Sequence, residues 1–348
     1  MVKMSVLSEI AKFIKENDHY LLATHVFPDG DNMGCVLALS EGLLRIGKDV
    51  SCYIEGPIPK IYTWMPKVEN IQTDLVKALA ALNGMRDLPN LLVVDSGDLR
   101  RIGNEFGKWL EMQGGKNSTR IVNIDHHISN DYFGDINWVD ASYSSVGEMI
   151  YELLMQLGVK LTGSMAQNLY TSVFTDTGRF SFSNTTAKSL QYAAEYVEAG
   201  ARPIDSFANV YANRTMKSFK LQSLSFKTLT KFLDGRGFYF VVDRKMLQET
   251  ETSLEDTEGF LDTVRTLRGF EIVTFFKEVD EGDIRVSVRA APPINASRLT
   301  NLFGGGGHPR AAGCRIQMKL DEAIAHFVTE TEKAIESGDV LDPEEESN

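Results

Sequence analysis

The sequence predicts an α/β protein of two domains, in which the first domain is a doubly wound, mainly parallel sheet and the second is a smaller α/β domain. In the first half, short and nearly all-apolar runs alternate with helical patterns, as in a sheet that helices cover on both faces. In the second half, the segment IRVSVR (284–289) alternates strictly, which is typical of a half-buried strand. A chain of 348 residues is long enough for two cores at about 150 residues per domain.

The first domain is expected over residues 1–205, with helices and strands in alternation. A short amphipathic pattern predicts a helix at 6–16, and the apolar run YLLATHV predicts a strand at 20–26. A helix at 33–46 follows. Further strands are expected at 50–55, 91–95 (LLVVD) and 121–125 (IVNID), and further helices at 145–157, 164–174 and 188–199.

A long helix at about 215–233 is expected to form a helical linker over 206–235. The second domain is expected over 236–340, with strands at 238–242 and 271–277 and a helix at 255–267 between them. A turn at 280–283 leads into the strand at 284–289. After a glycine run, residues 311–313 are expected to start a close-packed helix, followed by a strand at 315–318 and a closing helix at 321–335. Residues 341–348 read as an acidic tail.

Composition narrows the classes of function. The chain is 43% hydrophobic and 24% charged, which is ordinary for a globular protein and excludes a disordered or collagen-like chain. No apolar run approaches the roughly 18 residues of a membrane span, and no signal peptide is apparent. The three cysteines form no CxxC pair, which argues against a disulfide scaffold or a thiolate metal site. These features predict a cytoplasmic protein that does not bind membranes.

The charge is unevenly distributed along the chain. The net charge of −12 argues against bulk binding of duplex nucleic acid. Residues 284–315, however, contain five arginines and no acidic residue. A local site for an anion is therefore expected in the second domain.

Polar residues gather where the predicted strands end. Residues 24–31 (THVFPDGD) follow the first strand, Asp95 ends the third, and Asp125, His126 and His127 end the fourth, while Asp176 follows a helix. The carboxyl ends of parallel strands form the ligand-binding edge of an open sheet. Carboxylates and imidazoles without thiolates suit Mn²⁺, Mg²⁺ or Co²⁺, and a pair of ions would relieve the repulsion between several acids. A single Asp in such a place is more often a helix cap, but the whole set favours a metal site.

These segments resemble a known family. HVFPDGD (25–31), VVDSGD (93–98), IDHH (124–127) and TDTGRF (175–180) resemble the four motifs of the DHH phosphoesterase superfamily in order and spacing. GGGGHPRAAG (304–313), preceded by IRVSVR, resembles the associated DHHA1 domain. The layout is most similar to that of the nano-RNases, which are bifunctional oligoribonucleases and phosphatases of 3′-phosphoadenosine 5′-phosphate (pAp). The resemblance spans roughly residues 19–330 and implies a substrate cleft between the two domains.

The resemblance also implies the ligands of two Mn²⁺ ions, with Mg²⁺ or Co²⁺ as alternatives. One ion would be held by His25, Asp29 and Asp95, and the other by Asp31, Asp95, His126 and Asp176, with Asp95 bridging. Asp125 would orient a neighbouring histidine through a hydrogen bond, and His127 would face the reacting phosphate as a donor or general acid. The chain departs from the family pattern at Asn32 and Cys35, where Ala and Ser are commoner, which leaves the ligand set intact.

The glycine run is expected to take part in substrate binding, because its main-chain N–H groups can approach an anion. The expected substrate-binding residues are Gly305, Gly306, Gly307, His308 and Arg310, with Arg298 and Arg101 as weaker candidates. Arg285 and Arg289 share one face of the alternating strand, for which a solvated face is the simpler interpretation.

The resulting hypothesis is a two-metal phosphoesterase that hydrolyses RNA oligomers of a few nucleotides and removes a phosphate from pAp. A phosphodiesterase for cyclic or linear dinucleotides would share every motif and remains an alternative. A non-catalytic nucleotide-binding module is disfavoured by the intact ligand set, and a pyrophosphatase by the segment GGGGHPRAAG. The sequence leaves open whether the chain acts as a homodimer.

Overall fold

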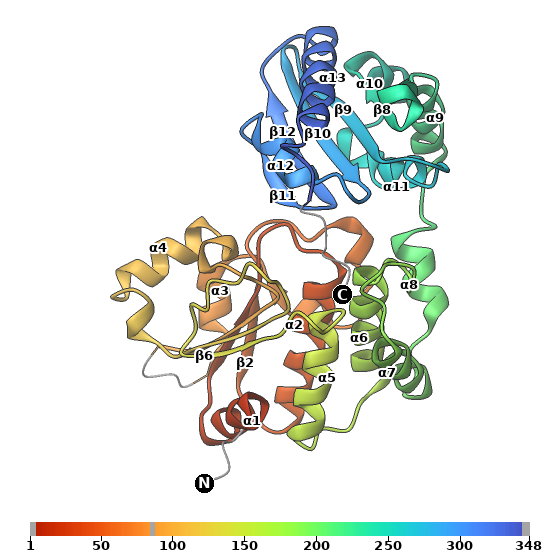
Figure 1. Ribbon diagram of the computed structural model, residues 1–348. Coiled ribbons are helices and arrows are strands. Elements are labelled where there is room, and N and C mark those ends of the chain that lie inside the picture. Colours follow the sequence, from red (N-terminus) through yellow and green to blue (C-terminus); the bar gives the residue numbers. More distant parts are fainter. Residues whose placement is uncertain (1–4, 84–87, 343–348) are drawn as a thin grey trace, which may run out of the picture. The chain divides into compact units, whose positions relative to one another are not determined.

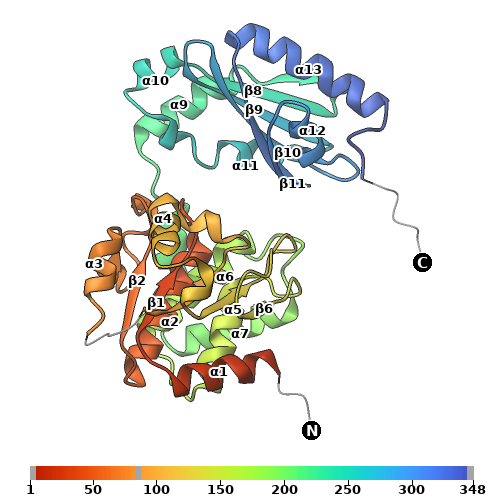
Figure 2. The same cartoon turned by 90° about the vertical axis from the view of Figure 1, so that its left-hand side faces the viewer.

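The computed structural model describes residues 5–83 and 88–342. The chain divides into two compact units, Met1–Asn213 and Arg214–Asn348 (Figures 1 and 2). The boundary therefore lies within the segment that was expected to link the two domains.

The first unit is built on a parallel sheet. Within the described ranges its strands follow the order β3-β2-β1-β4-β5-β6, and each neighbouring pair is parallel. The strands are β1 (Tyr20–Ala23), β2 (Val50–Tyr53), β3 (Ile71–Gln72), β4 (Asn90–Val94), β5 (Ile121–Asp125) and β6 (Ile136–Val139). The chain runs outward from β1 through β2 to β3 and then crosses to the other side of β1 with β4. The strand order reverses between β1 and β4, which is where an open α/β sheet binds its ligands.

Helices cover both faces of this sheet, as the apolar runs predict (Figures 1 and 2). Side chains alternate along β1, so that Tyr20 and Leu22 belong to one core cluster, whereas Leu21 and Ala23 belong to the other. The first cluster includes side chains of α1 (Val6–Glu16), α2 (Gly30–Arg45), α5 (Val146–Gln156), α6 (Gly163–Asp176) and α7 (Ala187–Glu198). The second includes α3 (Leu75–Ala80) and α4 (Asn104–Met112). Helix α8 (Pro203–Val210) packs against α6.

The second unit contains a mixed sheet, which in the described part of the chain has the order β11-β12-β10-β9-β8-β7. Its strands are β7 (Thr230–Phe232), β8 (Gly237–Val242), β9 (Ile272–Asp280), β10 (Asp283–Ala290), β11 (Gly306–His308) and β12 (Ala311–Ile316). Only β8 and β9 run parallel; the other neighbouring pairs are antiparallel. Helices α12 (Ala296–Asn301) and α13 (Leu320–Glu336) pack on one face, and α9 (Met216–Phe226) and α11 (Phe260–Val264) pack on the other. Helix α10 (Arg244–Thr250) lies against α9.

Three expectations for the second half were wrong. The helix expected at 215–233 ends at Phe226, because residues 230–232 pair antiparallel with β8. Residues 311–313 do not start a helix; they open β12, which pairs with β10 over six residues. The helix expected at 255–267 is broken at Gly259, whose φ of +75° is left-handed, and it is reduced to a 3₁₀ turn at Leu254–Thr257 followed by α11.

Two further features complete the description. Asp342, at the start of the expected acidic tail, is held by Asn295 and Arg310, and residues 343–348 lie outside the described residues. No helix within residues 5–83 and 88–342 has the length and apolar composition needed to cross a membrane.

Helices α2 and α6 make the closest helix–helix contact of the first unit, and a glycine allows it. A Cβ atom on Gly34 of α2 would collide with the backbone oxygen of Asn168 in α6 and would lie 2.8 Å from the Cβ of Ser172. No side chain larger than hydrogen fits at this position without moving one helix backbone.

We therefore expect the Gly34→Ala variant to be destabilised by about 1–3 kcal/mol through overpacking. Gly107→Ala is the matched control, because a Cβ there meets no described atom within 4 Å inside helix α4, and it should stabilise the protein by roughly 0.5–1 kcal/mol. Urea denaturation of both variants measures the difference. Equal effects in the two variants would contradict a tight α2–α6 contact.

Candidate metal centre and anion pocket

Three predicted ligands meet beside the ends of β1 and β4, and we call His25, Asp29 and Asp95 the first ligand group. One potential ligand atom from each of the three lies within 4.8 Å of the others. The His25 Nε2 atom is 3.9 Å from Asp95 Oδ2, and the His25 Nδ1 atom is 2.7 Å from the carbonyl oxygen of Val26. Nδ1 therefore carries the proton and donates it to that carbonyl, which leaves the lone pair on Nε2.

Asp29 has a second role, since it is the N-cap of α2. Its Oδ1 accepts hydrogen bonds from the backbone N–H groups of Asp31 and Asn32, at 3.0 and 3.3 Å. Asp29 is therefore both the N-cap of α2 and a member of the first ligand group.

The second ligand group consists of Asp31, His126 and Asp176, which come from α2, the end of β5 and the end of α6. The His126 Nε2 atom lies 3.9 Å from Asp31 Oδ2 and 3.5 Å from Asp176 Oδ2. The His126 Nδ1 atom lies 3.2 Å from the carbonyl oxygen of Tyr143, which directs Nε2 toward the carboxylates.

Asp31 is held in place from two other helices. Its carboxylate accepts hydrogen bonds from the backbone N–H groups of Val146 and Gly147, at 2.9 and 3.2 Å, at the N-terminus of α5. The hydroxyl of Ser172 in α6 donates a third, at 2.5 Å. A helix N-terminus favours a neighbouring carboxylate, so these donors offset part of the cost of burying the Asp31 side chain.

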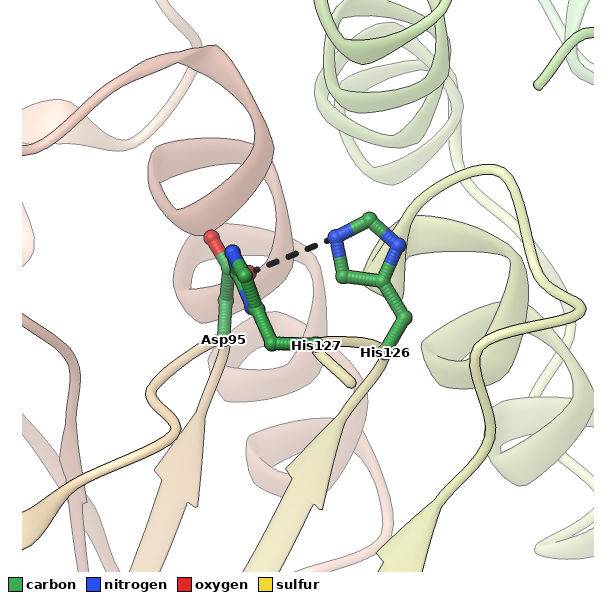
Figure 3. A group of neighbouring side chains, drawn as sticks. All are labelled: Asp95, His126 and His127. Carbon is green, nitrogen blue, oxygen red and sulfur yellow. Dashed lines mark ion pairs between the residues drawn. The ribbon is translucent and has the colours of Figure 1, made fainter. Parts of the chain in front are cut away.

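Asp95 belongs to the first ligand group and also lies close to His126 of the second, and Figure 3 shows it beside His126 and His127. Its Oδ2 faces His25, while its Oδ1 is 3.8 Å from His126 Nε2 and 3.6 Å from His127 Nδ1. Asp95 follows β4 with a φ of +53°, a left-handed conformation that Asp tolerates better than most residues. A strand was expected at 91–95, but β4 ends at Val94, so Asp95 lies just beyond it.

The chemistry around Asp95 fits a pair of cations. Its Oδ1 is buried and accepts no hydrogen bond from any described group. Burial, followed by the charges of Asp31 and Asp29, raises the pKa of Asp95 well above its usual range. A divalent cation on each side of Asp95 would satisfy the unpartnered oxygen and offset the repulsion between the carboxylates. The six predicted metal ligands fall into two groups of three residues, and Asp95 of the first group also faces His126 of the second.

Asp125 and His127 form a supporting pair beside the ligands. The buried carboxylate of Asp125 accepts hydrogen bonds from the backbone N–H of His126, at 2.9 Å, and from the side chain of Asn130, at 2.6 Å. Its Oδ1 also lies 2.7 Å from His127 Nδ1. Burial opposes ionisation of Asp125, but the hydrogen bond and charge of His127 outweigh it and lower the pKa of Asp125. Asp125 thus stays ionised and fixes the orientation of the His127 ring.

Arg101 lies on the same side of the sheet as the first ligand group. It belongs to the 3₁₀ turn Leu99–Ile102 after β4, and its carbonyl accepts a hydrogen bond from the N–H of Val26. Burial lowers the pKa of His25, and the positive charge of Arg101 adds to this effect. A neutral imidazole is the form that binds a metal.

The second unit contains a separate basic pocket. It is a cavity of about 890 Å³ that lies against β9, β10, β12 and the turn before α11. Four basic side chains (Lys277, Arg285, Arg289 and Arg315) and two acidic ones (Glu258 and Asp262) line it. Gly306 and Gly307 of the glycine run lie at its edge.

Lys277 and Arg289 are unusual for surface cations because both are partly buried. Burial and then the charge of Arg285 lower the pKa of the Lys277 ammonium, and burial lowers the pKa of the Arg289 guanidinium. Arg285 stands directly opposite Lys277 in the β9–β10 pairing. Cations held this close to one another repel, and a bound anion would offset that repulsion.

Arg310 and Arg298, two of the residues expected to bind substrate, make hydrogen bonds to other groups of the protein. The guanidinium of Arg310 donates to the carbonyl of Ile294 and to Asp342, and that of Arg298 donates to the carbonyl of Leu341. These two arginines therefore tie the C-terminal segment to α12 and β12. Their sequence context gave no sign of these partners.

The glycines have a packing role as well. A Cβ on Gly305 would collide with the backbone oxygen of Gly313, and one on Gly307, whose φ is +146°, would lie 2.7 Å from the oxygen of Ala311. His308 is exposed at the end of β11. The run GGGG is thus not a loose loop, because two of its glycines are needed for β11 to lie against β12.

Lys277 was not among the expected binding residues, and Arg285 and Arg289 were expected on a solvated face, yet all three line this cavity. A usable signal was present, since Lys277 stands in an apolar strand (IVTFFKEVD) where a charge is unusual, and the antiparallel hairpin of β9 and β10 aligns it with Arg285.

Two domain families match the chain. Residues 19–174 match the DHH family, N-terminal domain, and residues 236–337 match the DHHA1 domain. The chain is 29% identical over 322 residues to a bifunctional oligoribonuclease and PAP phosphatase NrnA of Thermus thermophilus, covering 92% of this chain and 91% of the relative. It is 28% identical to the protein of the same name from Bacillus subtilis, over 91% and 95% of the two chains.

A solved structure has the same fold. An exopolyphosphatase-related protein from Bacteroides fragilis superimposes with a TM-score of 0.85 at 22% identity, over 94% of this chain and 96% of the other. The architecture of the two units therefore recurs in an experimentally determined protein.

The geometry predicts different roles in metal binding for the two adjacent histidines. His126→Ala should reduce the bound Mn²⁺ from two ions per chain to one, because it removes the imidazole that faces three carboxylates. His127→Ala should keep both ions, because Asp125 engages its Nδ1. Metal analysis by mass spectrometry after gel filtration measures the ratio. Loss of an ion in both variants would mean that Asp95, His126 and His127, which also lie within ligand distance of one another, form a site, and the reverse pattern would make His127 the ligand in place of His126.

Proposed function

This chain belongs to the DHH family and carries the DHHA1 domain, and we propose that it is a divalent-metal-dependent phosphoesterase that hydrolyses short RNA oligonucleotides to mononucleotides and dephosphorylates pAp. The observation that carries the proposal is the placement of Asp95 between the two ligand groups. The substrates follow the names of relatives that match more than nine-tenths of this chain.

Each part of the metal centre has a role in the proposed reaction. When bound, two divalent ions activate water and stabilise the leaving oxygen of a phosphoester. Asp125 holds the imidazole of His127 through Nδ1, and we assign to His127 the donation of a proton or hydrogen bond to the reacting phosphate. Arg101 supplies a positive charge beside the first ligand group for a phosphate oxygen.

The basic pocket supports a preference for short substrates. Its cations can bind a second phosphate group, while its apolar lining, which includes Leu261 and Phe275, suits a base or ribose. A site that grips a nucleotide end accepts substrates with a terminal phosphate and little beyond it. We therefore assign anion binding to Lys277, Arg285 and Arg289, with Gly306 and Gly307 at the edge, in place of Arg298 and Arg310.

Mn²⁺ is the proposed metal. The donor set of aspartates and histidines without thiolates suits a borderline-hard ion of this kind. The cytoplasm is the proposed compartment, because Cys35, Cys52 and Cys314 are all free thiols.

A substrate panel tests the function. Purified protein with Mn²⁺ is incubated with RNA of two to ten nucleotides, pAp and cyclic dinucleotides, and the products are separated by chromatography. We expect mononucleotides from the shortest RNAs, AMP from pAp, and loss of both activities when Mn²⁺ is chelated. Faster hydrolysis of cyclic dinucleotides than of dinucleotides and pAp would favour the alternative phosphodiesterase.

The assignment of anion binding to the basic pocket is tested by replacing its arginines and, separately, Arg310. Loss of two charge-assisted hydrogen bonds at ~1.5–3 kcal/mol each should raise the KM of the double variant Arg285→Ala with Arg289→Ala for a dinucleotide by about 10²-fold or more. Its activity on a small nitrophenyl phosphodiester, which lacks a second phosphate, should change far less. Arg310→Ala is the matched control and should leave KM close to the wild-type value, since its partners are Ile294 and Asp342. A large KM effect of Arg310→Ala with none in the double variant would reverse the assignment.

A further inference from the structure

The basic pocket of the second unit contains two acidic side chains that the proposed function leaves without a role. Glu258 lies in the turn before α11, and Asp262 lies in the first turn of that helix. Both side chains are exposed. Carboxylates are unexpected in a cavity for an anion, because they weaken its attraction for a phosphate group.

The cations of the pocket lie on the sheet face against which α11 packs. Phe275 of β9 belongs to the same core cluster as the apolar side chains of α11. Lys277 is two residues further along β9 and therefore lies on the same face. Arg285 and Arg289 of β10 stand opposite Lys277 and Val273 of this face. The pocket thus has a basic floor formed by the sheet and an acidic edge formed by the start of α11.

The opposite charges of the pocket do not pair with each other. Within the described residues, no ion pair joins Glu258 or Asp262 to any of the four basic side chains, and the partner of Asp262 is Arg265, at 3.6 Å between Oδ1 and Nε. The charges still act across the cavity, since burial lowers the pKa of Arg289 and the charge of Asp262 partly offsets this effect. A ligand can therefore fill the space between the carboxylates and the cations.

A nucleotide has the chemical groups that fit this space. Its phosphates are anions for the basic floor, and its ribose hydroxyls and the amino group of its base are neutral donors to a carboxylate. A fully ionised polyphosphate offers no such donor and is only repelled by the two carboxylates. The acidic edge therefore disfavours a bare phosphate more than it disfavours a nucleotide.

We propose that Glu258 and Asp262 make the pocket selective for nucleotides over bare phosphates, by accepting hydrogen bonds from a ribose hydroxyl or from the base amino group of the bound nucleotide. The two carboxylates lower the affinity for the phosphate alone and raise the discrimination between the two kinds of ligand. This inference rests on the anion pocket of the proposed function, but it does not depend on the hydrolysis of any substrate.

Ligand binding to metal-depleted, full-length protein tests the proposal, because without metal neither ligand is hydrolysed or held by metal ions. Calorimetry compares pAp with fully ionised pyrophosphate. In the double variant Glu258→Ala with Asp262→Ala, pAp should bind roughly 10-fold more weakly, because charge-assisted hydrogen bonds are lost. Pyrophosphate should bind about 3-fold more tightly, because two repelling charges are removed.

Glu255→Ala is the matched control. It removes an exposed carboxylate from the same segment, but Glu255 does not line the pocket, so both affinities should stay close to the wild-type values. Tighter binding of both ligands in the double variant would show that the carboxylates only balance charge, and weaker binding of both would show that they only support the shape of the pocket. Either result overturns the proposal.

Two analogues identify the donor in the wild type, without any substitution in the protein. The 2′-deoxy analogue of pAp lacks the free ribose hydroxyl, and the inosine analogue has a carbonyl in place of the amino group. Weaker binding of one analogue supports the proposal and names the group that the carboxylates contact, whereas equal binding of pAp and both analogues overturns it. Opposite effects on pAp and pyrophosphate, in a protein that hydrolyses neither RNA nor pAp with Mn²⁺, would leave this inference standing and refute the proposed function.

Discussion

The structure of the first unit is organised around the mutual repulsion of carboxylates that a parallel sheet brings to one edge. Asp31, Asp95 and Asp176 lie around the same imidazole, and burial makes their charges costly to hold together. The fold offsets part of this cost with backbone donors at the N-terminus of α5 and with the hydroxyl of Ser172. It offers no donor to Asp95 Oδ1 among the described groups, and that remainder is the part a cation can satisfy.

The second unit gathers positive charges, whereas the first gathers negative ones, and it does so on a smaller scale. Lys277 and Arg289 are partly buried beside Arg285, and burial disfavours their charged forms. One unit thus collects negative groups that favour cations, and the other collects positive groups that favour an anion.

The sequence was enough to predict those helices and strands whose type follows from their own local pattern. The apolar runs at β1, β4 and β5 and the amphipathic period of α1 determine their type without reference to distant residues. The short strands β7 and β11 form by pairing with the strands that follow them, and β12 also pairs with β10, so strand pairing ends the helix expected over residues 215–233 before residue 230. Likewise, the residues of the two ligand groups could be named from the sequence because they stand in four short motifs, whereas the pocket depends on the register that aligns Lys277 with Arg285.

The contact between α2 and α6 has a consequence for ion selectivity. Asp31 follows Gly30, whose missing side chain admits Thr175, and Asp176 follows Thr175; one turn further along α2, Gly34 contacts the backbone of Asn168. The spacing of the two helices that carry these carboxylates is therefore set by two glycines, Gly30 against the side chain of Thr175 and Gly34 against the main chain of Asn168. Carboxylates on helices packed this closely would discriminate between ions by radius. A substitution at either glycine would then alter that discrimination without removing a carboxylate.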